Sequence, residues 1–171
     1  MSFLDNILVH RKIRNILQYS AWINKSKPVP APGFIKVQNI KIAAEVNSIH
    51  CLVETGTFKG ATPFILRNDF KEIYTIELDN DLFKEAKKKL SEFDHIKVFQ
   101  GSSSDVLPEI LKGINEPALF WLDGHYSGGE TAEGETATPI FDELTCIFKR
   151  KYNDVILIDD LRIFLNEGYG Y

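Results

Sequence analysis

The stretch that decides the fold is Cys51-Leu52-Val53-Glu54-Thr55-Gly56-Thr57-Phe58-Lys59-Gly60. It begins with a short apolar run that ends in an acid, a pattern typical of a buried parallel strand. Residues 61–70 then have the spacing of a helix. Glycines in the turn between a strand and a helix allow tight backbone geometry and close approach by a ligand. The stretch therefore predicts a strand, a ligand-binding turn and a helix, in that order.

The same alternation of strands and helices continues on both sides of this stretch. Five strands that alternate with helices indicate an α/β fold. The expected architecture is a Rossmann-like, doubly wound, mostly parallel sheet with helices on both faces. We predict strands at residues 51–54, 72–77, 96–99, 118–123 and 155–160, and helices at residues 36–49, 61–70, 81–93, 106–111 and 140–151.

An N-terminal helical appendage precedes this domain. Residues 3–17 repeat apolar side chains at helical spacing, and the polar face carries Arg11, Lys12 and Arg14. Such a helix packs on protein, including a second copy of the chain, or alternatively lies on a membrane surface. Residues 27–33 contain three prolines and one glycine, which no helix crosses. We predict two parts, residues 1–33 as a helix with a Pro-rich linker and residues 34–171 as the α/β domain.

The composition limits the kind of protein. The 171 residues fit one domain, and 20 Lys and Arg against 24 Asp and Glu give a net charge of −4, which argues against a nucleic-acid partner. The 44% of hydrophobic residues excludes disorder of the whole chain. No stretch is apolar for long enough to span a bilayer, and residues 1–6 lack a secretory signal. Cys51 and Cys146 each lie in an apolar run, which indicates buried, reduced thiols. We therefore expect a cytoplasmic protein.

Acidic residues close four of the five predicted strands. Ligands bind at the carboxyl ends of strands in such sheets, and an acid beside an apolar strand is costly to bury unless it binds something. This edge of the sheet is therefore the predicted site. The acids are Glu54, Glu77, Asp123 and the pair Asp159-Asp160.

The turn after the first strand, with the pattern E-x-G-x-x-x-G, favours one class of ligand. It lacks the glycine pair of the dinucleotide pattern G-x-G-x-x-G, and the carboxylate of Glu54 would repel a pyrophosphate. The same carboxylate would attract an ammonium group, such as that of S-adenosylmethionine. The alternative is an ordinary glycine turn with a solvated Glu54.

Glu77 narrows the choice, because it ends the next predicted strand. An acid at this position can accept both ribose hydroxyls of an adenosine. A surface or helix-capping acid is the alternative, although Asp79 and Asp81 are better placed to cap the next helix. After the third strand, residues 100–105 supply small polar side chains where an adenine edge would lie, and these are equally suited to cap a helix.

A second cluster follows the fourth and fifth strands. If these strands are adjacent, Asp123, His125, Asp159 and Asp160 lie close together. Neighbouring carboxylates repel one another unless a cation or protons intervene, and oxygen ligands favour a hard ion such as Mg²⁺. His125 could then take the proton of a bound hydroxyl as general base. The alternative is that the paired aspartates cap the next segment and His125 bonds to a loop backbone.

Residues 127–139 separate the two halves of this cluster. They hold three glycines, three acids and no large apolar side chain. Such a long segment without predicted structure is often a substrate lid, and its hydroxyls and carboxylates favour a polar acceptor. A disordered surface insertion is the alternative.

The ordered set formed by residues 54–60, Glu77, Gly101-Ser102 and Asp123 resembles the successive motifs of class I S-adenosylmethionine-dependent methyltransferases, from about residue 40 to 165. The resemblance implies that residues 34–171 form an S-adenosylmethionine-binding, methyltransferase-like domain. Glu54 and Gly56 would hold the methionine part of the cofactor, Glu77 the ribose, and Ser102 or Ser103 would lie beside adenine. The full implied set is Glu54, Thr55, Gly56, Thr57, Gly60, Glu77, Leu78, Ser102, Ser103 and Asp123.

The patterns D-G-x-Y-S at residue 123 and I-D-D at residue 158 resemble the site of metal-dependent sugar O-methyltransferases of macrolide and aminocoumarin pathways. That resemblance implies Mg²⁺ bound by Asp123, Asp159 and Asp160, with Asp123 and His125 as catalytic residues. The sequence departs from the pattern at His125, where those enzymes usually have another acid as base. His125 either takes over that role or works without a metal.

The expected function is transfer of a methyl group from S-adenosylmethionine to a hydroxyl of a sugar or other polar small molecule. The alternatives are a methyltransferase for a non-saccharide acceptor and a catalytically silent S-adenosylmethionine-binding module. A nicotinamide-dependent oxidoreductase is disfavoured by the missing glycine pattern. Members of the class usually carry two more strands after the fifth, and residues 161–171 are too few for them. We therefore expect the C-terminal strands to be missing: either the chain is shortened at its C-terminus, or the fifth strand leaves an edge that a partner, such as a second copy, or the N-terminal helix must cover.

Overall fold

The computed structural model describes residues 3–26, 31–124 and 139–159, with side chains from residue 13 onward. The chain divides into two units, residues 1–39 and 40–171, and the predicted division after residue 33 stays a prediction. The elements are α1 (Phe3–Asn24), α2 (Gly33–Val46), β1 (Cys51–Thr55), α3 (Ala61–Leu66), β2 (Glu72–Glu77), α4 (Asn80–Leu90), β3 (Ile96–Gln100), α5 (Ser103–Leu111), β4 (Ala118–Leu122), α6 (Ile140–Ile147) and β5 (Val155–Ile158).

The first unit contains α1 and the beginning of α2. Helix α1 continues to Asn24, beyond the predicted end at residue 17, because no proline or glycine interrupts residues 18–24. The ring of Tyr19 contacts the rings of Trp22 and Phe34, with centroid distances of 6.2 and 6.3 Å. These aromatic contacts join the end of α1 to the start of α2.

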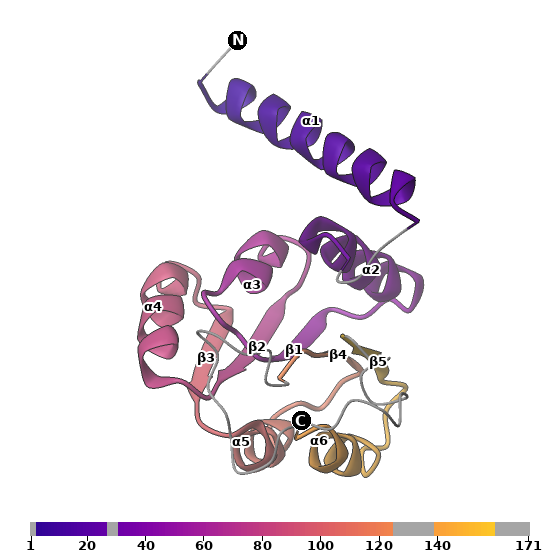
Figure 1. Cartoon of the computed structure of the whole chain (residues 1–171). Helices are drawn as coiled ribbons and strands as arrows, with labels where there is room; N and C mark the ends of the chain where they lie inside the picture. Colours follow the sequence, from indigo (N-terminus) through magenta and orange to yellow (C-terminus); the bar gives the residue numbers. More distant parts are fainter. Residues whose placement is uncertain (1–2, 27–30, 125–138, 160–171) are drawn as a thin grey trace. The chain divides into compact units, whose positions relative to one another are not determined.

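The second unit is built on a sheet of five parallel strands in the order β3-β2-β1-β4-β5. The chain runs outward from β1 to β3 and then returns across β1 to β4, as Figure 1 shows. The direction of winding reverses between β1 and β4, which is where sheets of this kind bind ligands. The predicted doubly wound parallel sheet is confirmed.

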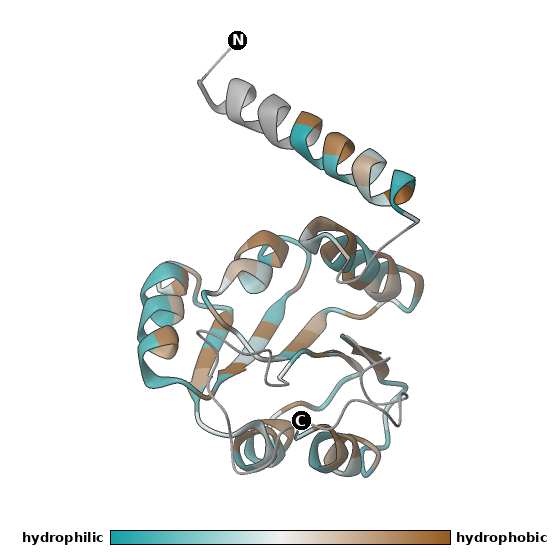
Figure 2. Cartoon of the chain, in the orientation of Figure 1, coloured by the Kyte–Doolittle hydropathy of each residue, from teal (hydrophilic) through white to brown (hydrophobic). Residues whose placement is uncertain are grey.

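Helices cover both faces of the sheet. Helices α3 and α4 lie on one face, and α5 and α6 lie on the other (Figure 1). Cys51 and Val53 of β1 pack with apolar side chains of α5 and α6, so the intervening Leu52 and Glu54 point to the opposite face. Figure 2 shows apolar strands and a largely hydrophilic α4. Successive side chains at the end of β1 therefore reach different faces of the sheet.

Several helix boundaries differ from the predicted ones. Helix α5 begins at Ser103, earlier than predicted, because its first turn is polar and adds nothing to the apolar periodicity. Helices α3, α4 and α6 end at Leu66, Leu90 and Ile147, before the predicted ends, because apolar residues continue past each helix into the turn that follows. None of the helices in the described part of the chain is both long and apolar enough to cross a membrane.

The predictions for His125 and Asp160 lie outside the described residues, as do those for residues 127–138 and 161–171.

Candidate cofactor-binding site

The turn between β1 and α3 is held by backbone geometry that excludes most side chains. Gly56, Phe58 and Gly60 all have positive φ angles, of 81°, 50° and 66°. The N–H groups of Gly56 and Thr57 both donate to the carbonyl of Ile76, at 3.0 and 3.1 Å. A Cβ added at Gly56 would lie 2.4 Å from the carbonyl oxygen of Asp123. The turn is therefore pressed against the end of β4, and glycine is required at residue 56.

Glu77 joins this turn to the start of α4. One carboxylate oxygen accepts from the N–H of Phe58 at 2.6 Å, and the other accepts from the N–H of Asp79 at 3.0 Å. Burial raises the pKa of Glu77, and these two N–H groups oppose the rise. Asp79 itself caps α4, because its carboxylate accepts from Asp81 and Leu82, both at 2.8 Å. Glu77 thus has a different task from capping, and each of its oxygens keeps a lone pair for a further donor.

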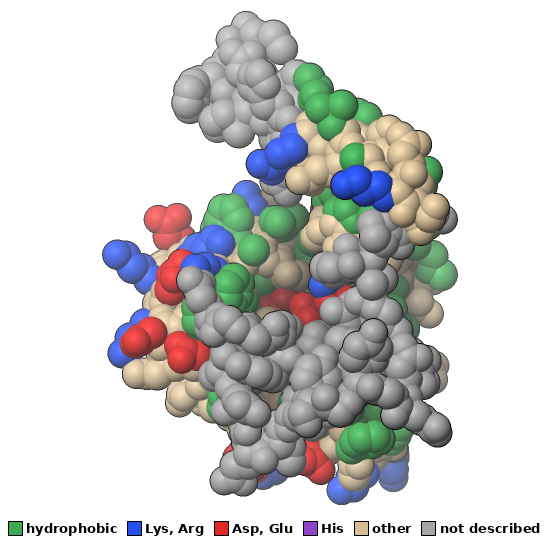
Figure 3. Space-filling view, in the orientation of Figure 1, with side chains coloured by type: hydrophobic (Ala, Val, Ile, Leu, Met, Phe, Trp, Pro, Cys, Tyr) green, Lys and Arg blue, Asp and Glu red, His purple; other side chains and the backbone are tan. Residues whose placement is uncertain are grey.

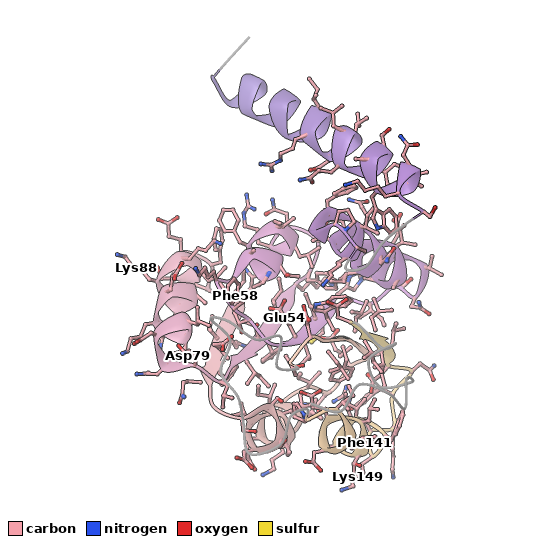
Figure 4. The ribbon with its side chains drawn as sticks, in the orientation of Figure 1. Glu54, Phe58, Asp79, Lys88, Phe141 and Lys149 are labelled. Atoms are coloured by element: carbon pink, nitrogen blue, oxygen red, sulfur yellow. The ribbon has the colours of Figure 1, made fainter. Side chains whose placement is uncertain are left out.

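Glu54 is buried rather than solvated. Its carboxyl accepts from the hydroxyl of Thr75 at 2.6 Å, across the paired residues of β1 and β2. Burial raises the pKa of Glu54 to about 8; the hydroxyls of Thr75 and Thr62 oppose this rise, and the negative charge of Asp123 adds to it. Figure 4 shows Glu54 and Phe58 at this end of the sheet. An acid with this pKa is largely protonated at neutral pH and ionises when a cation approaches.

The turn after β3 lies beside Glu77. Gly101 donates its N–H to the carbonyl of Glu77 at 2.9 Å, and the Gln100 side chain donates to the carbonyl of Leu78 at 3.0 Å. Ser102 is the N-cap residue of α5, and Ser103 is its first residue. The structure therefore brings Leu78, Ser102 and Ser103 to the edge where Glu77 ends β2.

The ends of β4 and β5 bring Asp123 and Asp159 together. The two strands pair up to Leu122 and Ile158, and Asp159 donates its N–H to the carbonyl of Leu122 at 2.9 Å. The adjacency predicted for these strands is confirmed. Within residues 3–26, 31–124 and 139–159, no three His, Cys, Asp or Glu side chains lie close enough to hold a metal ion. The metal set remains a prediction, because its third member, Asp160, is not described.

Two residues of this region were missed by the sequence analysis. Phe58 is 41% exposed and keeps a positive φ, which is unusual for a bulky residue and marks a functional or strained position. Glu143 of α6 is 1% exposed at the ends of β1 and β4. The only signal for Phe58 is its place midway between Gly56 and Gly60, and the sequence of α6 gives none for Glu143.

The comparisons with known proteins support the fold. No protein-family model matches the chain, and no curated protein matches it. The O-methyltransferase TomG from Streptomyces achromogenes, involved in tomaymycin synthesis and crystallised with SAM, superposes with a TM-score of 0.64 at 17% identity, over 90% of this chain and 69% of that one. The SAH-bound methyltransferase PaMTH1 from Podospora anserina gives a TM-score of 0.57 at 15% identity, over 83% of this chain and 61% of that one.

The chain therefore has the α/β fold of class I S-adenosylmethionine-dependent methyltransferases, as the order of its motifs predicted. Identities of 17% and 15% establish the fold and leave the activity to be argued from the site.

We expect Gly56→Ala to lower the free energy of unfolding by at least about 2 kcal/mol, because the new Cβ meets a backbone oxygen and φ is positive. Urea denaturation measures the effect. Gly113→Ala is the matched control, because its Cβ would lie no closer than 3.6 Å to its neighbours. Equal losses in the two variants would show that the turn has room for a side chain.

We expect Glu54→Gln to remove a pH dependence of stability. The pKa of Glu54 is raised to about 8, so between its ordinary value and pH 8 the folded chain holds a proton that the unfolded chain has lost. Wild-type stability should therefore fall as pH rises through this window, by up to about 1.4 kcal/mol per pH unit relative to Glu54→Gln. Denaturation at about pH 5 and pH 8 measures this change in stability. Glu109→Gln, at an exposed ion pair, is the control. Parallel curves of stability against pH for Glu54→Gln and wild type would contradict the prediction.

Proposed function

We propose that this chain is an S-adenosylmethionine-dependent O-methyltransferase that acts on a hydroxyl of a sugar or another polar small molecule. The observation that supports this most directly is the bond from the Phe58 N–H to the Glu77 carboxylate, at 2.6 Å. It joins the glycine turn after β1 to the acid that ends β2, in a fold shared with SAM- and SAH-bound methyltransferases. The glycine turn suits the ammonium arm of such a ligand, and the acid at the end of β2 suits its ribose.

The residues at this edge fit the proposed cofactor. Glu54 lies in β1, directly before the turn. Because its pKa is raised to about 8, it gains a negative charge when an ammonium approaches. Gly56 leaves only backbone at the closest approach of β1 and β4. Glu77 has lone pairs for the ribose hydroxyls, and Ser102 lies where the adenine edge is expected. When bound, S-adenosylmethionine supplies an electrophilic methyl group, and the chain's task is to orient the acceptor and remove its proton.

The ends of β4 and β5 support the acceptor half of the proposal. Asp123 and Asp159 follow the last paired residues of adjacent strands, and Asp159 is 8% exposed. Their oxygens suit a hard cation such as Mg²⁺, with Asp160 as the third proposed ligand. We propose His125 as the general base that removes the acceptor proton.

The remaining proposals concern partners and location. We propose a small-molecule acceptor, no nucleic-acid partner, a cytoplasmic location and pairing of two copies through α1 or the edge of β5. The surface of α4 supports the absence of a nucleic-acid partner, because it carries acids as well as lysines and Lys84 pairs with Asp81 at 3.0 Å. Figure 3 shows this mixture on the α4 side of the molecule. A broad basic face for a polyanion would carry one sign of charge.

Calorimetry with S-adenosylhomocysteine, S-adenosylmethionine and NAD tests the cofactor half. We expect both adenosyl ligands to bind and NAD not to bind. Glu77→Ala should weaken binding at least about 100-fold, because it removes the ribose acceptor and releases the turn at Phe58. Glu85→Ala, at an exposed position of α4, is the matched control and should bind as wild type does. A folded wild-type chain that binds neither adenosyl ligand would contradict the proposal.

An activity assay with saccharide acceptors, with and without Mg²⁺, tests the catalytic half. We expect His125→Ala to keep the wild-type affinity for S-adenosylhomocysteine and to lose at least about 100-fold in turnover, as expected when a general base is removed. Normal turnover of this variant would show that another group takes the proton. Cofactor binding with no turnover on any acceptor would favour the silent binding module.

A further inference from the structure

A second buried carboxyl lies behind the same edge, on the face of the sheet opposite to Glu54. Glu143 projects from α6 and is 1% exposed. Neither its Oε1 atom nor the hydroxyl of Thr55 has a hydrogen-bond partner among the residues that the structure describes. A buried oxygen without a partner costs about 1–3 kcal/mol, so this pair requires an explanation beyond packing.

The two oxygens face one point at the end of β4. A Cβ built on Gly124 would lie 3.1 Å from the Thr55 hydroxyl and 3.4 Å from Glu143 Oε1. The hydroxyl of Ser103, which is buried at the start of α5, lies near the same carboxyl. Burial raises the pKa of Glu143, and the Ser103 and Thr55 hydroxyls oppose that rise without closing a hydrogen bond at Oε1. One side chain of α6 therefore meets the end of β1, the start of α5 and the residue after Asp123.

The rest of the inner face of α6 is apolar. Ile140 and Ile147 belong to the core that packs against β1 and β4, and Glu143 lies between them at helical spacing. An apolar side chain of similar volume at residue 143 would continue this stripe. Replacing a buried charged group by such a side chain is often neutral or stabilising, so packing alone does not favour an acid here. Phe141 and Lys149, by contrast, point away from the sheet (Figure 4).

We propose that Glu143 is a positioning residue of the cofactor site, which fixes the end of β1, the start of α5 and the end of β4 relative to one another. Each of these segments carries a proposed cofactor contact directly beside the residue that meets Glu143: Gly56 follows Thr55, Ser102 precedes Ser103, and Asp123 precedes Gly124. Glu143 acts through these neighbours. The inference rests on the proposed function, because it concerns the affinity for an adenosyl ligand.

The test compares Glu143→Met with Glu143→Gln and measures two quantities, the free energy of unfolding and the Kd for S-adenosylhomocysteine. Glu143→Met keeps the volume and removes the buried oxygens, so we expect stability equal to or above wild type and a Kd at least about tenfold higher. Glu143→Gln keeps an acceptor oxygen and should stay within about threefold of the wild-type Kd. Asp142→Asn, at the exposed neighbouring position, is the control and should change neither quantity.

Thr55→Val extends the test without touching α6. We expect it to raise the Kd by at least about threefold, and the double variant with Glu143→Met to bind no worse than Glu143→Met alone, because both substitutions alter the same approach of the Glu143 carboxyl to the end of β1. If Glu143→Met does not fold, Thr55→Val and Glu143→Gln still decide, and a wild-type Kd for Thr55→Val then overturns the proposal.

A stable Glu143→Met variant with the wild-type Kd would show that Glu143 only fills space. If the wild-type chain itself does not bind S-adenosylhomocysteine, the proposed function fails and this inference fails with it. A wild-type chain that binds while both Glu143 variants also bind normally overturns this inference alone.

Discussion

At the carboxyl ends of β1 and β4 the two backbones lie so close that residue 56 has no room for a side chain and must be glycine. A Cβ there would lie 2.4 Å from the carbonyl oxygen of Asp123, whose own N–H donates to the carbonyl of Thr55 at 3.1 Å. The same turn donates two N–H groups to Ile76 of β2. Three strand ends thus form one hydrogen-bonded edge, and the chain leaves β1 through the positive φ angles of Gly56, Phe58 and Gly60.

This close approach determines the electrostatics of the edge. Side chains that point into it are removed from water, and burial raises the pKa of three carboxyls there, those of Glu54, Glu77 and Glu143. Each is stabilised in a different way: Glu54 by threonine hydroxyls, Glu77 by two backbone N–H groups, and Glu143 only in part. Perturbed carboxyls gathered at a strand edge are characteristic of functional sites.

The sequence predicted the parallel sheet, and the structure confirms it. Apolar runs mark all five strands, because burial on both faces of a parallel strand leaves a local pattern. The adjacency of the fourth and fifth strands was also expected and is confirmed by the pairing of Leu122 with Ile158. The start of α5 was missed, because a polar first turn carries no apolar signal.

What the sequence could not predict depends on contacts between distant segments. The positive φ of Phe58 goes with a hydrogen bond to Glu77, 19 positions further along the chain. The burial of Glu143 depends on how α6 packs against the ends of β1 and β4, and an acid inside a helical stretch looks like any solvated one. Phe58 departs from the backbone preference of a bulky residue, and Glu143 departs from the preference of an acid for the surface. Function or strain is expected at positions that break such preferences.

The strand order also divides the work between two groups of strands. The residues proposed to hold the cofactor come mostly from the ends of β1, β2 and β3, and those proposed to hold the acceptor follow β4 and β5. Asp123 belongs to both groups. Its backbone lies against Gly56 after β1, and the residue itself comes directly after the end of β4. The residues proposed to hold the cofactor and those proposed to hold the acceptor therefore meet at the close backbone contact between Gly56 and Asp123.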